Sequence, residues 1–276
     1  MQGKTVWLVT SLFCRRKHWN GVFNTGIKPF ITEGDILSYQ IGLNYQGGEN
    51  IRLAFLAEED RAGDLALHAR DYFQSFFSSA GLVPSETGLP VKGIFMPFPC
   101  NTIQFGLYEA STSDHHIERA ISDIMLQALP ENDIEEETIL MTAYYLHISL
   151  LVTLCPYGGK EMAHYSPVYQ SRLLTSETID EPFKQNELNA NRSIFMEVIR
   201  DISASRSGKE MSIPSRLAQW MALCKRIISE MPASESHRYL SHYINKQLGI
   251  TGDMNILLNY FIYQTFFTPL CINSTL

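Results

Sequence analysis

The amino-acid sequence predicts an α+β protein in which a β-rich N-terminal third packs on a mostly helical C-terminal part. Three observations indicate this class. A continuous apolar run of β-forming residues, Val6–Phe13, is typical of a central strand buried on both faces. Two segments, 36–45 and 50–56, are separated by Gly47 and Gly48, which predicts an antiparallel hairpin. Beyond residue 110, apolar residues recur at steps of three and four, as they do on helices.

The second strand of the predicted hairpin carries an arginine on its more polar face. Side chains alternate along a strand, which places Ile51, Leu53 and Phe55 on one side and Asn50, Arg52 and Ala54 on the other. If the apolar set faces the core, Arg52 faces a groove or solvent.

Helices account for most of the remaining chain. Ser113 or Asp114 can cap the first helix beyond residue 110, and Pro130 stops it. The expected helices run from after Asp60 to Phe77 and over about 114–129, 133–154, 192–203, 214–230, 235–247 and 253–267. A short edge strand is expected over Gly93–Pro99, because its two prolines exclude a central position. The polar stretch 157–191 is expected to be a long loop.

Length and composition favour one cytoplasmic domain. We expect a single domain over 1–276, with residues 1–110 mainly in strands and 111–276 mainly in helices. The chain has 22 Lys and Arg against 29 Asp and Glu, a formal net charge of −7, so no nucleic-acid partner is expected. The short basic run Cys14–His18 is interpreted as a solvated turn after the first strand. Five scattered cysteines without a Cys-x-x-Cys pair indicate reduced thiols in the cytoplasm.

Neither a membrane span nor a metal or cofactor site is expected. The apolar run Ile139–Cys155 is shorter than the roughly 20 residues of a transmembrane helix, and it contains His147, so a buried core helix is favoured. His115 and His116 are adjacent, and adjacent helical residues point about 100° apart, which is unsuited to holding one ion. No P-loop, dinucleotide-binding glycine fingerprint, zinc-protease helix motif or nucleophile elbow is present.

A polar face near the C-terminus is the best candidate for acid–base chemistry. His242 has Tyr239, Asn245 and Lys246 at helical steps of three and four, and Tyr243 follows it directly. An imidazole, a phenol, an amide and an amine on one face can exchange protons near neutral pH. A solvated face of a surface helix is the structural alternative. His147 lies among apolar residues, where a core histidine bonded to a neighbour is favoured over a functional one.

Three segments resemble, in order and spacing, the C-terminal domain of lantibiotic dehydratases. Asn50-Ile-Arg52-Leu-Ala54-Phe55 resembles the family's strand His-(Leu/Ile)-Arg-Leu-Arg-Phe. Asn101-Thr-Ile-Gln104-Phe105-Gly106-Leu107 resembles Glu-x-x-Arg-Tyr-Gly-Gly, and His242-Tyr-Ile-Asn-Lys246-Gln-Leu resembles His-Met-x-x-Asn-Arg-Leu. The family uses this fold as the glutamate-elimination domain of lanthipeptide dehydratases. It also uses the fold in stand-alone proteins that form pyridine rings in thiopeptide biosynthesis.

The departures from the family pattern argue against glutamate elimination. Where the eliminases have Arg, Glu and Arg, this chain has Ala54, Asn101 and Gln104, and only Arg52 and His242 remain. A carboxylate leaving group uses charge-assisted contacts that these replacements remove.

The resemblance therefore implies a cofactor-free thiopeptide pyridine synthase. Such an enzyme joins two dehydroalanines of a modified precursor peptide by a formal [4+2] cycloaddition, and loss of water and of the leader peptide makes the ring aromatic. The expected catalytic residues are His242, Arg52, Tyr239, Tyr243 and Lys246. The expected substrate-binding residues are Asn101, Gln104, Tyr108, Asn245 and His147.

Two alternatives remain open at this point. One is a glutamate-elimination enzyme of a split dehydratase. The other is a non-catalytic peptide-binding partner of a dehydratase. In all three cases the expected partner is a precursor peptide with its leader, together with other enzymes of the pathway.

Overall fold

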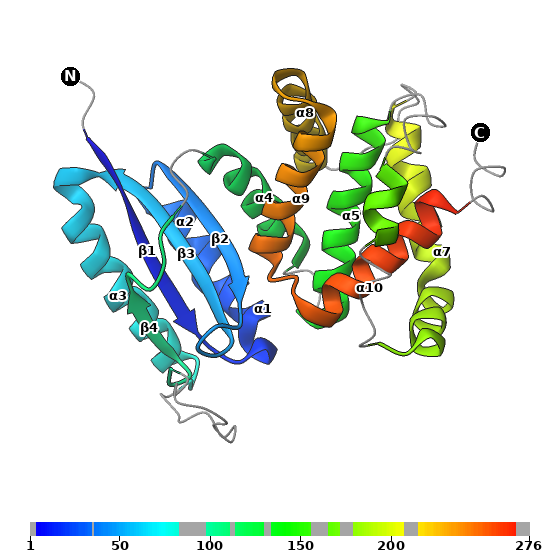
Figure 1. Ribbon diagram of the computed structural model, residues 1–276. Coiled ribbons are helices and arrows are strands. Elements are labelled where there is room, and N and C mark those ends of the chain that lie inside the picture. Colours follow the sequence, from blue (N-terminus) through cyan, green and yellow to red (C-terminus); the bar gives the residue numbers. More distant parts are fainter. Residues whose placement is uncertain are drawn as a thin grey trace. The chain divides into compact units, whose positions relative to one another are not determined.

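The computed structural model describes residues 4–34, 36–82, 98–110, 114–129, 134–155, 165–171, 179–206 and 215–268. Contacts within the chain divide it into two compact units. The first comprises Met1–Thr138 and Lys246–Gly249, and the second comprises Ile139–Asn245 and Ile250–Leu276. An antiparallel sheet in the first unit and a mostly helical chain confirm the α+β class (Figure 1). A single domain over 1–276 stays a prediction.

The first unit contains an antiparallel sheet, in which the described strands have the order β2-β3-β1-β4. Their bounds are Thr5–Phe13 for β1, Ser38–Asn44 for β2, Asn50–Glu58 for β3 and Thr102–Phe105 for β4. The expected hairpin of β2 and β3 is confirmed, and Gly47 and Gly48 take positive φ angles in its turn, which suits residues without a Cβ. β1 is central, as expected, but only its C-terminal half is buried.

Helices also occupy part of the first hundred residues, so the expectation that 1–110 is mainly strands is wrong. A largely helical stretch contains Arg16–His18, α1 (Trp19–Gly21), the π-helical Val22–Ile27 and α2 (Lys28–Glu33). Its apolar residues follow a helical step and are buried: Trp19, Val22, Phe23, Ile27 and Phe30. The run Cys14–His18 is thus partly the start of this stretch rather than a simple turn.

Two longer helices complete the first unit. The 3-10 turn Glu59–Arg61 leads into α3 (Ala62–Ser79), which buries Leu65, Ala69, Phe73 and Phe77 at four-residue steps and contacts β1, β3 and β4. Helix α4 (His115–Ala128) contacts β2. Asp114 precedes α4 as expected, although its side chain makes no capping hydrogen bond.

The second unit is helical throughout its described residues. It is formed by α5 (Glu136–Leu154), a short helix at 165–171, α7 (Glu181–Arg206), α8 (Ser215–Glu230), α9 (Ala233–Leu248), α10 (Gly252–Ile262) and the π-helical Tyr263–Phe267. The first residues of α5 and the last residues of α9 belong to the first unit.

The expected loop over 157–191 is wrong in two places, because 165–171 is helical and α7 begins at Glu181. The early turns of α7 bury few side chains, Lys184 and Leu188 among them, so they carry little apolar periodicity. The expected strand at Gly93–Pro99 falls mainly on 93–97, outside the described residues.

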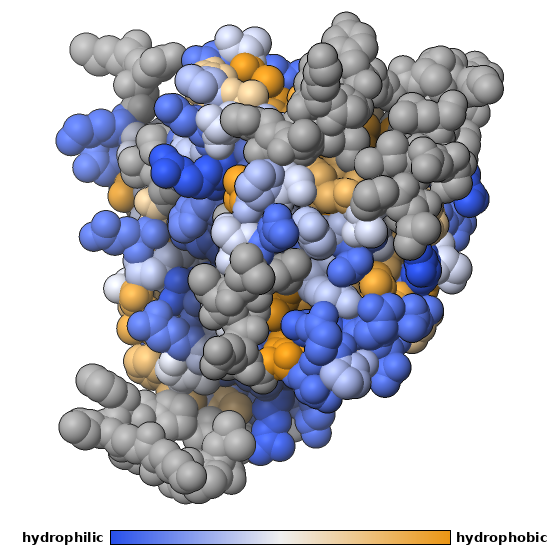
Figure 2. Space-filling model, turned by 45° about the vertical axis from the view of Figure 1, so that its right-hand side comes forward, coloured by the Kyte–Doolittle hydropathy of each residue, from blue (hydrophilic) through white to orange (hydrophobic). Residues whose placement is uncertain are grey.

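Apolar surface is the last feature of the fold that bears on function. Among the described residues, only α5 is long and apolar enough to span a membrane. Of its most apolar 18-residue stretch, 67% is buried, as in a core helix. On the face shown in Figure 2, hydrophobic residues form small patches among hydrophilic ones. The exposed large hydrophobic residues of the first unit include Leu37, Leu67, Phe105 and Leu107.

Candidate functional site

A pocket opens in the first unit between segments that are far apart in the sequence. It is half open, and its empty space is about 480 Å³ when the solvent at its mouth is counted. Its walls come from β2, β3, the segment after β4, α4 and the last turn of α9. The lining residues are Gln40, Ile41, Gly42, Leu43, Arg52, Tyr108, Glu109, Glu118, Lys246 and Gln247.

The strand register places Arg52 on one wall of the pocket. Arg52 lies opposite Gly42 of β2 and Ser11 of β1, and Ser11 lies opposite Gln104 of β4. Directly opposed residues share a face of the sheet. Gly42 has no side chain, so the strand position beside Arg52 is left open. A Cβ added at Gly42 would meet no atom closer than 3.7 Å.

The Arg52 guanidinium is held by neutral groups. It donates to Gln46 Oε1 at 3.2 Å and lies 4.8 Å from the centre of the Tyr108 ring. Desolvation by burial lowers the pKa of Arg52. The Arg52 guanidinium keeps its positive charge, and its neutral neighbours balance that charge only weakly. This favours contact with an acceptor group of a ligand.

Tyr108 supplies a neutral phenol at the same wall. Its hydroxyl donates to the carbonyl of Thr10 at 3.4 Å. Burial raises the pKa of Tyr108 well above its ordinary value, and the opposing effect of nearby Arg52 is smaller. The phenol therefore keeps its proton at neutral pH and can act as a donor.

An ion pair between Glu118 and Lys246 forms the opposite side of the site. Lys246 Nζ lies 2.8 Å from Glu118 Oε1. The side chain of Glu118 is 4% exposed, whereas that of Lys246 is 45% exposed. The second carboxylate oxygen, Glu118 Oε2, is buried and has no hydrogen-bond partner among the described residues. The pair thus buries a carboxylate whose bonding capacity is only half used.

Gln247 joins α4 to the outer edge of β2. Its Nε2 donates to the carbonyls of Ile41 at 3.0 Å and Glu118 at 2.7 Å, and it lies 3.0 Å from Ser122 Oγ. The Ile41 N–H donates to Ser122 Oγ at 2.8 Å, and Ser122 donates to the Glu118 carbonyl. Both backbone groups of Ile41 are therefore satisfied at an edge that would otherwise be free to pair with another strand.

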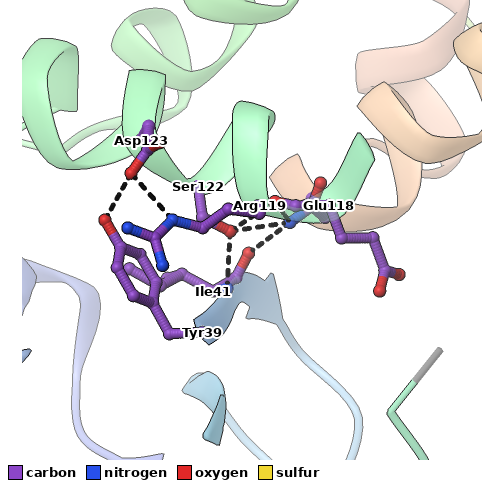
Figure 3. A network of polar contacts seen from close by, with 7 residues as sticks. Tyr39, Ile41, Glu118, Arg119, Ser122 and Asp123 are labelled. Atoms are coloured by element: carbon purple, nitrogen blue, oxygen red, sulfur yellow. Dashed lines mark hydrogen bonds and ion pairs between the residues drawn. The ribbon is translucent and has the colours of Figure 1, made fainter. Parts of the chain in front are cut away.

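A second cluster holds the same helix in place (Figure 3). Tyr39 donates to Asp123 Oδ1 at 2.5 Å, Arg119 Nε lies 3.1 Å from the same oxygen, and the Arg119 guanidinium lies 3.6 Å from the Tyr39 ring centre. Figure 3 shows the Glu118 carboxylate extending away from this cluster. The two sets of contacts fix α4 against β2 and thereby position Glu118.

Three of the residues expected from the sequence meet at this pocket: Arg52, Tyr108 and Lys246. Asn101 and Gln104 lie in the same unit but are not among its lining residues. Asn101 takes a φ of 60°, and its N–H donates to the Phe13 carbonyl at 2.5 Å, where β4 begins beside β1. Its position is thus explained by strand pairing, and its substrate contact stays a prediction.

The remaining expected residues belong to the second unit. His242 is exposed on α9, with its ring centre 5.6 Å from that of Tyr243, and Tyr239 and Tyr243 are 5.2 Å apart. His147 is 1% exposed, and its Nε2 lies 2.9 Å from Asn245 Oδ1, as expected of a core histidine. Asn245 also donates to Asn255 at 3.3 Å. None of the five is among the described residues that line the pocket.

Sequence reasoning missed Glu118, Gln247 and Gln40 as site residues. One signal was available, because Glu118 and Ser122 stand four residues apart within the apolar face of α4, beside Ile117 and Ile121. A carboxylate inside such a face needs a partner. Its partner, Lys246, lies 128 residues away in the sequence and could not be identified from local spacing.

Comparisons with known proteins show the fold. No protein-family model matches the chain, and no curated protein matches it. Among solved structures, the pyridine synthase TbtD from thiomuracin biosynthesis is similar, with a TM-score of 0.65 and 13% identity over 94% of this chain and 96% of that one. The crystal structure of TsrL is also similar, with a TM-score of 0.60 and 10% identity over 99% and 97%. This chain therefore has the fold of those two proteins along nearly its whole length.

Proposed function

We propose that this protein is a pyridine synthase of thiopeptide biosynthesis that acts on a dehydrated precursor peptide. The fold likeness to TbtD, which covers 94% of this chain and 96% of that one, carries the proposal. The order of the three sequence segments that resemble the dehydratase C-terminal domain supports it independently. The enzyme would act in the cytoplasm, without a cofactor, beside the other enzymes of its pathway.

The proposed reaction joins two dehydroalanines by a formal [4+2] cycloaddition and closes a macrocycle. Loss of water and then of the leader peptide makes the six-membered ring aromatic. Holding two distant side chains together supplies much of the rate enhancement, because it removes the entropic barrier to their encounter. The remaining steps require weak acids and bases rather than a strong nucleophile.

The proposed roles follow the chemistry of each residue. Arg52 polarises an amide carbonyl of the substrate, and Tyr108 and Lys246 donate hydrogen bonds beside it. His242 is the proposed acid–base residue, with Tyr239 and Tyr243 as neutral donors on the same helix. Substrate contacts are proposed for Asn101, Gln104, Asn245 and His147.

Glutamate elimination is less well supported. Arg52 is the one arginine among the described residues that line the pocket. At the next position on the same face of β3 stands Ala54, which is fully buried. A leaving carboxylate would thus meet a single guanidinium at this pocket, without a second arginine side chain to bind it.

Mass spectrometry on a dehydrated, azole-bearing precursor peptide tests the proposal. A pyridine synthase produces the cyclised product and free leader peptide. Loss of glutamate from a glutamylated precursor would instead identify an eliminase. Unchanged substrate together with measurable binding would identify a non-catalytic peptide-binding partner and overturn the proposal.

A further inference from the structure

Two enclosed acceptor oxygens among the pocket residues lack hydrogen-bond partners within the described part of the chain. Glu118 Oε2 and Gln247 Oε1 are both buried without a hydrogen bond to any described residue. Glu118 and Gln247 are 3% and 4% exposed, so water does not readily satisfy them. The orientation of Gln247 is fixed, because its nitrogen faces the carbonyl oxygens of Ile41 and Glu118. The pocket thus contains unmet acceptor capacity of about one or two hydrogen bonds.

The same pocket contains a cation, Arg52, that has no carboxylate partner among the residues that the structure describes. Within the described part of the chain, Arg52 donates to the amide of Gln46 and stacks on Tyr108, and forms no ion pair. Its guanidinium has five N–H groups, of which one is used by Gln46. Arg52 can therefore donate to a ligand.

A ligand group that fits this pocket must donate a hydrogen bond to Glu118 and accept one from Arg52, and few chemical groups do both. A carboxylate would bind Arg52, but it has no hydrogen to donate to Glu118 Oε2, whose charge is already matched by Lys246. An ammonium group can donate to Glu118, but it offers no acceptor to Arg52 and would meet the positive charges of Arg52 and Lys246. A secondary amide has one N–H donor and one carbonyl acceptor, carries no charge and matches both residues.

We propose that this pocket binds a backbone amide of the precursor peptide, with its carbonyl on Arg52 and its N–H on Glu118 Oε2. Gln247 Oε1 accepts from a second N–H. The identity of the peptide rests on the proposed function, whereas the preference for an amide rests on the pocket alone. Glu118 is thereby a residue that determines specificity, beyond the residues indicated by the sequence.

A small movement is required for this contact, because both oxygens are enclosed in the unliganded chain. The side chain of Lys246 is 45% exposed, and within the Glu118 carboxylate it contacts the other oxygen, Oε1. It has room to swing toward solvent while the backbone stays fixed. Gly42 leaves space beside Arg52, since a Cβ there would meet only ordinary contacts at 3.7 Å and beyond.

Ligand-observed NMR titration with three matched probes tests the assignment. The probes are N-acetyldehydroalanine methylamide, its fully N-methylated form and N-acetyldehydroalanine as the free acid. In the unmodified protein the methylamide binds most tightly. N-methylation weakens binding about tenfold or more, since a hydrogen bond to a charged acceptor is lost. The free acid also binds more weakly.

Glu118→Gln provides a reversal test. Lysine can only donate, so the new amide turns its oxygen to Lys246 and its NH₂ to the pocket. The variant then prefers the free acid over the methylamide. Glu109→Gln, which makes the same charge change at an exposed lining residue, keeps the original order. Gly42→Val fills the pocket and weakens all three probes.

Three results would overturn the assignment: tightest binding of the free acid by the unmodified protein, an unchanged order in Glu118→Gln, or no saturable binding of the methylamide. Thermal unfolding of each variant shows whether it is folded. The titration needs no turnover, so an inactive protein that binds the methylamide rejects the proposed reaction but keeps the amide site. Turnover without the reversal in Glu118→Gln keeps the proposed reaction but rejects the amide site.

Discussion

Buried polar groups are treated differently in the two units of the chain. In the second unit three pairs of buried side chains bond to each other: Tyr144 with Thr265 at 2.7 Å, Trp220 with Ser149 at 3.0 Å, and Tyr169 with His237 at 2.9 Å. At the pocket of the first unit, Glu118 and Gln247 each keep an enclosed oxygen without a described partner. Paired groups specify a structure, whereas unpaired ones at a pocket provide binding capacity for a ligand.

The largest expected effect on stability is in the second unit. Trp220 is fully buried, so Trp220→Ala should lower the free energy of unfolding by about 3–5 kcal/mol through lost packing. Chemical denaturation measures the change. Trp220→Phe, which keeps an aromatic ring and loses mainly the bond to Ser149, is the control and should be clearly milder. Equal losses in the two variants would contradict the packing explanation.

The second-largest loss of stability is expected for Gln247→Leu. It removes the amide that satisfies the carbonyls of Ile41 and Glu118, and we expect a loss of about 2–4 kcal/mol from two newly unpaired groups. Gln127→Leu makes the same substitution on the exposed side of α4 and should change stability by less than about 0.5 kcal/mol. A loss at Gln247 no larger than at Gln127 would show that the amide does not fasten the β2 edge.

Tyr169→Phe should have a smaller effect on stability and none on activity. It deletes one buried hydroxyl from the pair with His237, which is worth about 1 kcal/mol. Tyr263→Phe is the matched control, because the Tyr263 hydroxyl forms no hydrogen bond with another residue in the described part of the chain. Reduced turnover by a fully folded Tyr169→Phe protein would assign this pair a functional role instead.

Arg52→Gln should separate stability from function. Burial already disfavours the charged form, as the lowered pKa indicates, so the neutral variant should unfold within about 0.5 kcal/mol of the original protein. Product formation should fall about tenfold or more, because a charge-assisted contact to the substrate is removed. The rate of leader release, followed by mass spectrometry, checks this. Arg70→Gln at an exposed site should leave it unchanged.

His242→Ala should have the smallest effect on stability, because the side chain is exposed. If His242 is the acid–base residue, leader release should slow by about 100-fold or more. Arg238→Ala, one helical turn earlier on the exposed surface of α9, should release leader at the original rate. Release at that same rate by His242→Ala would remove the acid–base assignment.

The elements that sequence predicted well are those with strong local patterns. β1, the hairpin of β2 and β3, and helices α3, α4, α5, α8 and α9 each have the expected type and nearly the expected ends. The failures have local causes. Glycines and a proline interrupt the helical stretch 16–33, and the early turns of α7 bury too few apolar residues to show a period.

The site could be predicted only in part, since its halves come from opposite ends of the chain. Arg52 follows from strand alternation, and Tyr108 and Lys246 follow from their places near family-like segments. Glu118 can be recognised as a site residue only in the folded chain, where Lys246, 128 residues away in the sequence, lies beside it. Long-range pairs of this kind leave no spacing signal in a single sequence.

The membership of the first unit has a consequence for synthesis on the ribosome. Residues Met1–Thr138 are completed by Lys246–Gly249, which emerge only after the intervening segment has been translated. At about 5–20 residues per second, that interval lasts on the order of 10 s. Throughout it, the carbonyl of Ile41 lacks Gln247 and the Glu118 carboxylate lacks Lys246. The unit whose strands are made first is therefore finished late, and a nascent chain stalled before residue 246 would carry an incompletely protected sheet edge.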